Sequence, residues 1–383
     1  MKIFEIFYRF LLLGLVSFGG PMAHIAYFRD TFVVKLKWLD EISYSKLVAL
    51  SQFLPGPSSS QVGFAIGLKR AGLSGALAAF LGFTIPSFFI LYFLAIFDIS
   101  QNQSGWIFGV VVGLKLFAVV IVADATIGMF KSFCKSKATV FIFVFSTLVL
   151  LFFSTIYTQI FVLIVSAFLG NLFIKNDIKD EQKELKKTKL VPFSIFFILL
   201  VTLPFLSNIN DELKLFSSFY EAGSLVFGGG HVVLPLLQET LGTMVSDDSF
   251  LVGYSLAQGV PGPMFTIASY LGADIFTSSP LLGAILATIA IFLPGFLLIL
   301  SFYNSFESYT SKGKIINAIS GVNAAVVGML FAVLCNLVFP SAVHSLYDLI
   351  FVIMGFVLLK RFKTPIWILL FLFIMFGVVK NLI

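Results

Sequence analysis

The sequence has little charge and few of the residues that form enzymatic or metal sites. Of its 383 residues only 11% are Asp, Glu, Lys or Arg, and there are two cysteines and three histidines, whereas 59% are hydrophobic. This composition cannot cover a soluble domain with a polar surface. The cysteines and histidines show no metal-ligand spacing, and no glycine-rich phosphate loop precedes a Lys-Ser or Lys-Thr pair. We therefore expect no enzyme, no cofactor and no metal, and any pumping would need an ion gradient or a partner.

Long apolar segments are what the chain has instead. Runs of about 17 to 25 residues, enough to cross a lipid bilayer, recur along the sequence, as in Leu73 to Phe97, Trp106 to Phe130 and Leu281 to Tyr303. The first apolar segment has no small-residue cleavage site, and we expect it to be retained. The sequence predicts an all-α polytopic membrane protein.

The net charge of +6 does not indicate nucleic-acid binding. The basic residues lie in short loops between apolar segments and not along one amphipathic helix face. This distribution is typical of a membrane protein with positively charged cytoplasmic loops.

A lysine-rich stretch divides the chain near its middle. Residues 175–189 (KNDIKDEQKELKKTK) contain six lysines and predict a cytoplasmic linker. We therefore divide the chain into a first repeat at 1–174, a charged linker at 175–190 and a second repeat at 191–383.

The same landmarks follow each other in the two repeats. Phe18-Gly19-Gly20-Pro21 matches Phe227-Gly228-Gly229-Gly230 at 209 positions, and Gln52 with Pro55-Gly56-Pro57 matches Gln258 with Pro261-Gly262-Pro263 at 206 positions. Glycine and alanine landmarks further along match at close to 208 positions. Landmarks that keep nearly one offset indicate a duplication.

The second repeat is predicted to be inverted in the membrane. It has one extra apolar segment, Pro192 to Leu206, which would reverse its orientation. Loops that are basic in the first repeat, such as the one with Lys69-Arg70, have no basic residue in the second repeat. The loop at 98–105 of the first repeat has no basic residue, whereas its equivalent in the second repeat carries Lys312 and Lys314. This reversal of charge is what an inverted repeat requires.

The Gly-Gly and Pro-Gly-Pro motifs would break helices inside apolar stretches. The segments that carry them either span the membrane or re-enter it as hairpins. Re-entry keeps the basic loop from Arg29 to Lys46 on the cytoplasmic side and is favoured, which predicts about nine full crossings and about four broken hairpins.

Paired helix breaks in two related halves point to a transport site. The half-helices that follow Pro57 and Pro263 would present free N–H groups and a positive dipole end to an anion, helped by Ser58 and by the two glutamines. The competing interpretation is that these motifs only kink or pack helices, as we assume for Gly63, Gly67 and the small residues from Gly72 to Ala79. The predicted substrate-binding residues are Gly19, Gly20, Gln52, Pro55, Gly56, Pro57, Ser58, Lys115, Gly228, Gly229, Gln258, Pro261, Gly262 and Pro263.

Ionisable residues inside apolar segments are further candidates, because they are costly in a membrane. Lys115 could neutralise a dianion, and His24, His231, Asp124 or Glu221 could exchange a proton. The alternatives are a hydrogen-bonded structural histidine and an aspartate near the membrane surface.

Together, the motifs at 18–21 with His24, 50–57, 227–230 and 258–263 resemble those of the chromate ion transporter family in its long, two-domain form. The resemblance covers almost the whole chain outside the linker and the last apolar segments. It implies a bacterial inner-membrane protein that exports chromate, driven by the proton gradient, and confers chromate resistance. The chain departs from its own repeat at Gly230, where the first copy has Pro21, and at Asn323, where it has Lys115.

Other functions stay open at this stage. Sulfate is a tetrahedral dianion like chromate, so an uptake carrier for sulfate or a related oxyanion is the main alternative. A membrane-embedded enzyme or lipid-handling protein is a third option. The expected partners are the oxyanion, protons and the lipid bilayer, with a homodimer as one option for the assembly.

Overall fold

The computed structural model describes residues 2–18, 20–97, 105–153, 155–174, 188–227, 233–306 and 313–382. In these ranges every regular element is a helix. Five helical segments are long and apolar enough to cross a membrane: α4 (Ser58–Ile96), α5 (Gly105–Phe133), α7 (Ile156–Phe173), α13 (Pro280–Phe302) and the run Gly313–Ala342. The prediction of an all-helical, multi-pass membrane protein is confirmed, while the number of crossings stays a prediction.

The two halves contain the same elements in the same order. Besides α4, α5 and α7, the first half contains α1 (Lys2–Val16), α2 (Gly20–Phe28), the π-helix η1 (Arg29–Lys35), α3 (Glu41–Phe53) and α6 (Lys137–Phe152). Their second-half equivalents are α9 (Asp211–Leu225), α10 (Val233–Leu241), the 3-10 turn η3 (Gly242–Met244), α11 (Asp247–Gly259) and α17 (Leu346–Arg361). The second half also contains η4 (Met264–Thr266), α12 (Ile267–Ile275), α15 (Gly313–Val333), η5 (Leu334–Val338), α16 (Phe339–Ala342) and α18 (Ile366–Leu382). The extra apolar segment forms α8 (Leu190–Leu206) between the halves.

Even the interruption of α4 has an equivalent. Ala71 and Gly72 have non-helical backbone angles, and Gly72 has a φ of 65°. The matching position in the second half is the gap between α12 and α13. Across these breaks a Cβ on Gly67 would overlap the backbone of Gly75, and a Cβ on Gly272 would overlap that of Gly283. These glycines are close-packed helix contacts, as predicted for Gly67 and Gly75, and they support the duplication.

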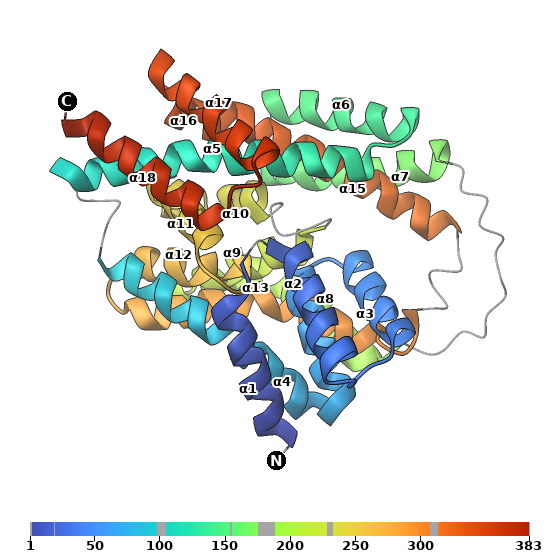
Figure 1. Ribbon diagram of the computed structural model, residues 1–383. Coiled ribbons are helices and arrows are strands. Elements are labelled where there is room, and N and C mark those ends of the chain that lie inside the picture. Colours follow the sequence, from blue (N-terminus) through green and yellow to red (C-terminus); the bar gives the residue numbers. More distant parts are fainter. Residues whose placement is uncertain are drawn as a thin grey trace.

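The helices form two bundles, and each bundle takes helices from both halves (Figure 1). The first bundle joins α1, α3 and α4 to α8, α9, α12 and α13. The second joins α5, α6 and α7 to α15, α17 and α18. The chain therefore does not fold as two separate domains side by side.

In the second bundle the last helix of each half packs on the other half. A Cβ on Gly377 of α18 would overlap the backbone of Gly113 of α5, and a Cβ on Gly170 of α7 would overlap the backbone of α15 close to Gly321. Small residues at such crossings let two helix backbones approach closely. A reciprocal exchange of this kind is what an approximate two-fold relation between the halves produces.

The first two helices form a hairpin. Phe10 of α1 packs on Phe28 and Phe32, with ring centroids 5.4 and 4.7 Å apart. After η1, Trp38 lies under the guanidinium of Arg70, 4.9 Å from its ring centroid, so the chain has returned to the side on which α4 is interrupted. Re-entry of this segment into the membrane stays a prediction.

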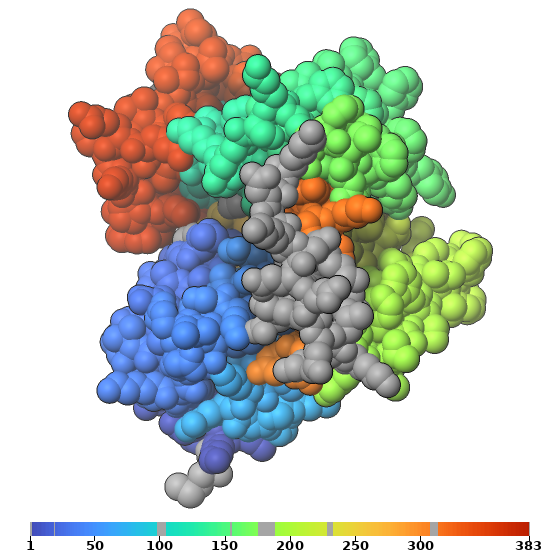
Figure 2. Space-filling view, turned by 90° about the vertical axis from the view of Figure 1, so that its right-hand side faces the viewer, coloured from blue at the N-terminus to red at the C-terminus, as the bar shows by residue number. Residues whose placement is uncertain are grey.

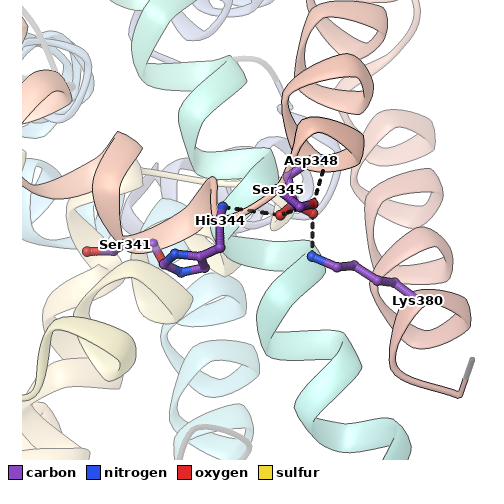
Figure 3. Close-up of polar contacts among 5 residues, drawn as sticks. All are labelled: Ser341, His344, Ser345, Asp348 and Lys380. Atoms are coloured by element: carbon purple, nitrogen blue, oxygen red, sulfur yellow. Dashed lines mark hydrogen bonds and ion pairs between the residues drawn. The ribbon is translucent and has the colours of Figure 1, made fainter.

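Ion pairs hold the C-terminal helices in place. Asp348 in the first turn of α17 is fully buried and pairs with Lys380 of α18 at 2.6 Å (Figure 3). Ser345 and the backbone N–H of His344 donate to the same carboxylate (Figure 3). Both oxygens of the carboxylate are used, because Oδ1 accepts from Lys380 and Oδ2 accepts from Ser345 and His344. The contact therefore fixes the junction between α17 and α18.

Candidate functional site

Two backbone hydrogen bonds join the Pro-Gly-Pro motif of each half to the other half. The N–H of Gly56 donates to the carbonyl oxygen of Val226 at 2.7 Å, and the N–H of Gly262 donates to that of Ser17 at 2.9 Å. Val226 and Ser17 each directly precede the phenylalanine of a Phe-Gly-Gly motif. We call this region, residues 17, 55–57, 226 and 261–263, the central junction. Both predicted motif types therefore meet, and they meet between the halves.

Glycine is required at both donor positions. Gly56 and Gly262 have φ angles of 123° and 107°, which side-chain-bearing residues rarely adopt. A Cβ on Gly56 would lie 2.9 Å from the Cα of Gly295, and a Cβ on Gly262 would lie 2.8 Å from the Oγ of Ser87. The motif thus permits two backbone segments to approach each other closely inside the protein.

Helix α4 begins in the central junction with an uncapped N-terminus. Its N-cap residue is Pro57, which makes no side-chain cap, and the first-turn residues Ser58, Ser59 and Ser60 are all buried. The first N–H groups of a helix have no partner within the helix and carry a partial positive charge. A buried start of this kind can bind an anion.

Several buried polar atoms around this helix start have no hydrogen-bond partner among the described residues. They are the hydroxyls of Ser17, Ser60 and Thr84 and the Oε1 of Gln61. The amide of Gln61 donates to the carbonyls of Pro55 and Gly295, at 2.8 and 3.2 Å, so it also bridges the halves. Since buried polar groups are normally paired, unused hydroxyls beside a helix N-terminus favour a ligand that accepts hydrogen bonds.

Gln61 was not among the residues predicted from the sequence. Its position one turn after Pro57, directly after the three serines, was the available signal. The predicted Gln52 is exposed instead, whereas its equivalent Gln258 is buried and donates to the sulfur of Met264.

His24 belongs to the same group of residues. It is buried, and its ring nitrogens lie 3.2 Å from the carbonyl oxygen of Ser17 and 3.3 Å from the hydroxyl of Ser59. It therefore connects α2, the central junction and the first turn of α4. A proton gained by His24 would place positive charge directly beside the helix start.

The second half contributes fewer donors. After Pro263 the chain forms a 3-10 turn with Met264 and Phe265, and the hydroxyl of Thr266 donates to the carbonyl of Pro263. By the offset of the repeat, the equivalent of His24 is Val233. The two halves are therefore alike in backbone but unequal in chemistry.

Two of the predicted charged residues, Lys115 and Asp124, lie in ion pairs. Lys115 has a side chain that is 14% exposed and pairs with Asp248 at 2.7 Å, which joins α5 of the first half to α11 of the second. Asp124 pairs with Lys360 of α17. Glu221 on α9 is partly buried. The positive charge of Lys115 is thus already compensated in this arrangement.

Some predicted residues cannot be placed. Gly19, Gly228, Gly229 and His231 lie outside the described residues, as does the linker from 175 to 187. Their described neighbours Ser17 and Val226 are in the central junction.

One pocket opens near the described end of the linker. It measures about 280 Å³ and is lined by Ser43, Lys46, Lys69, Tyr303 and Asn304 among others. Close to it in sequence, the N–H of Lys189 donates to the carbonyl of Ser301 at 3.1 Å. Figure 2 shows this end of the molecule, where blue segments of the first half and orange segments of the second half both reach the surface. Basic residues of both α3 and α4 therefore lie on the linker's side.

The segments α2–α3 and α10–α11, which are equivalent in the two halves, pack differently. α11 contacts α5 and α18, and α10 contacts α7 and α15, so this pair joins the two bundles. The equivalent α3 has its main contacts with η1, α4 and α13, which leaves out the second bundle. The bundles are therefore held together more firmly on the side of α11 than on the side of α3.

Comparison with known proteins is consistent with this geometry. A family model described as chromate transporter matches residues 4–171 and 213–378, one segment in each half. An uncharacterized transporter of Methanocaldococcus jannaschii is 31% identical over 379 residues, covering 96% of this chain and 92% of that protein. Chromate transport proteins of Pseudomonas aeruginosa and Cupriavidus metallidurans are 25% and 27% identical and cover 87% and 84% of this chain, or 80% and 79% of their own. No solved structure matches the chain.

Proposed function

Since the chain belongs to the chromate transporter family, we propose that it is a secondary transporter that exports chromate across the cytoplasmic membrane of a bacterium, driven by the proton gradient. Export of chromate would confer resistance to it. The observation that carries the proposal is the central junction, where an uncapped helix start and unpaired hydroxyls from one half meet the backbone of the other.

The oxyanion binds at the start of α4. The N–H groups of Ser58, Ser59 and Ser60 and the hydroxyls of Ser17 and Ser60 are donors, and a tetrahedral dianion offers acceptors in several directions. The site lies between the halves, as in transporters built from inverted repeats. Gly56 and Gly262 let the backbone close around it.

Transport proceeds by a change in how the two bundles meet. In the described arrangement α10 and α11 join the bundles and the Lys115–Asp248 pair reinforces this side. In the alternative arrangement α3 makes the equivalent contacts with α15 and α7, α2 makes them with α5 and α18, and the α11 side opens. Two states of this kind expose one central site alternately to either face.

The side of α3 faces the cytoplasm in this proposal. Lys46 and Lys69 line the pocket on that side, near Lys189 and the cytoplasmic linker, in agreement with the preference of basic residues for the cytoplasm. Their charge raises the local concentration of a dianion. The second repeat is then inverted relative to the first, the boundaries at 174 and 191 separate the repeats, and a homodimer stays a prediction.

His24 is the residue that couples export to protons. It touches both the central junction and Ser59, so protonation adds a positive charge beside the bound dianion. For an inward proton gradient to drive export, His24 takes up its proton from the outer side after chromate has left and carries it to the cytoplasmic side. Loss of the proton there, before the outward step, weakens anion binding and favours release outside. Glu221 and Asp124 lie outside this group of contacts.

The test is uptake of radioactive chromate into inverted membrane vesicles from cells with and without the protein. Protein-dependent accumulation that a protonophore abolishes supports gradient-driven export, and accumulation that persists with the protonophore contradicts the coupling. Competition by excess sulfate measures specificity.

Uptake of labelled sulfate into right-side-out vesicles, with no chromate accumulation in inverted ones, would favour the sulfate carrier instead. The donors in the central junction are N–H and hydroxyl groups, which bind both dianions, so this measurement decides between the two substrates. Turnover of a lipid or other substrate without ion flux would favour an enzyme.

A further inference from the structure

In the first half, ion pairs lock the hairpin formed by η1 and α3. Arg29, the first residue of η1, pairs with Glu41, the first residue of α3, at 2.6 Å. Asp30 beside it pairs with Lys35 at 2.7 Å. Two carboxylates are thus compensated by two basic side chains of the same half.

The second half keeps the two carboxylates and lacks the two basic residues. At the offset of 209, Arg29-Asp30 corresponds to Gln238-Glu239, and Lys35 corresponds to Met244. Glu41 begins α3 after its N-cap, and Asp247 begins α11 in the same way. The position equivalent to the Arg29–Glu41 pair therefore holds an amide and a carboxylate, with a second carboxylate next to it.

A pocket of about 190 Å³ lies at this position. Its polar lining consists of Gln159, Gln238, Glu239, Asp247 and Asn336, and no Lys or Arg is among the described residues that line it. A volume of this size holds an ion with several waters.

A buried amide in the lining also lacks a partner. Gln159 of α7 is 3% exposed, its Nε2 donates to the carbonyl of Pro235 at 3.4 Å, and its Oε1 has no hydrogen-bond partner in the described part of the chain. Asn336 lies on the π-helix η5, and its Nδ2 donates to the carbonyl of Leu151 at 3.1 Å. The Oε1 of Gln159 is therefore a candidate ligand, and the Oδ1 of Asn336 is a second.

We propose that this pocket binds one hard divalent cation, Ca²⁺ or an ion like it, between α10 and α11. Two carboxylates, amide oxygens and water form the oxygen-rich ligand set that such cations prefer. The charge of +2 equals that of the two basic side chains missing from this half. The absence of cysteine and histidine from the described lining disfavours zinc.

The bound cation connects α10 to α11 as the Arg29–Glu41 pair connects η1 to α3. Asp248, which pairs with Lys115, is the next residue after Asp247, so the cation also steadies the contact that joins the bundles. The pocket lies near the start of α7, about 20 Å along that helix from its end at Phe173, which precedes the linker. With the orientation of the proposed function, the pocket therefore faces outward, where divalent cations are abundant.

The test is thermal unfolding of the purified full-length protein in detergent, first with EDTA and then in a series of CaCl₂ concentrations. We expect the midpoint to rise by at least about 2 °C and to saturate in roughly the millimolar range, as for weak extracellular calcium sites. Equilibrium dialysis with radioactive calcium should give one ion per chain. Neither measurement uses chromate, so failure of chromate export leaves this inference intact, and the reverse also holds.

Four variants separate the inference from a nonspecific salt effect. Glu239→Gln and Asp247→Asn should lose the calcium response, while Asp30→Asn in the first half should keep it. Gln238→Arg should raise the midpoint in EDTA and remove the calcium response, because the arginine would pair with Asp247. An unchanged response in Glu239→Gln, or no response in the wild-type protein, would overturn the proposal.

Discussion

Replacing Gly56 with alanine should abolish transport and destabilise the central junction. The φ of 123° is unfavourable for alanine, by about 1–3 kcal/mol. The added Cβ would lie 2.9 Å from the Cα of Gly295 in the other half, an overpacking cost of about 1–3 kcal/mol. Moving the two segments apart would also weaken the hydrogen bond to Val226, by about 0.5–1.5 kcal/mol.

These costs together amount to about 3–7 kcal/mol. Even the lower value would change the equilibrium constant for forming the central junction by a factor of roughly one hundred. We expect the Gly56→Ala protein to insert in the membrane and to retain less than about one hundredth of the wild-type chromate flux. Its thermal midpoint in detergent should also fall.

The matched control is Gly242→Ala. Gly242 also has a positive φ, 50°, but a Cβ there has nothing within 4 Å. It should cost only about 1–2 kcal/mol and keep most of the flux. The assay is chromate uptake into inverted vesicles, normalised to the amount of protein in the membrane. Wild-type flux and an unchanged midpoint in Gly56→Ala would refute the close approach of the halves at this point.

Three further predictions follow from contacts between helices. Gly262→Ala should lose chromate flux and lower the thermal midpoint. Adding Ser87→Gly should restore part of the midpoint, because the Oγ of Ser87 is the nearest atom to the new Cβ. A midpoint that stays equally low in the double variant would contradict this contact. Lys115→Met and Asp248→Asn should be non-additive by about 1 kcal/mol in a double-mutant cycle of unfolding, since the two side chains form one partly exposed pair; additive effects would mean that the pair contributes nothing. Asp348→Asn should lower the stability by about 1–3 kcal/mol, measured by denaturation in detergent, because its lysine partner would be left beside a buried neutral amide; an unchanged midpoint would argue against the contact.

Much of the fold follows from the sequence because a duplication repeats its helix breaks. The offsets that match the Phe-Gly-Gly and Pro-Gly-Pro motifs also match helix boundaries, as at α3 and α11. The meeting of these motifs could be expected, since buried backbone needs hydrogen-bond partners. That Gly56 donates to Val226 of the other half, and not to its own Phe-Gly-Gly segment, could not be read from an offset.

The contacts of the charged residues were less predictable. The offset places Asn323 opposite Lys115 and Ile42 opposite Asp248, so the repeat gives no hint of their ion pair. Gln61 lies in a helix whose other inward residues are apolar or small, and its role depends on Gly295 from the other half. Pairings between elements far apart in sequence depend on the arrangement of the bundles, which local patterns do not encode.

The exchange of α7 and α18 between the halves affects how the protein can be assembled. α5 is synthesised long before α18. Its glycine face at Gly109 and Gly113 therefore stays uncovered until α18, the last helix of the chain, is made. α15, by contrast, meets the already inserted α7 as soon as it enters the membrane. The second bundle is therefore completed only at the end of translation, and two half-length chains made separately would need to associate with each other to bury their glycine faces.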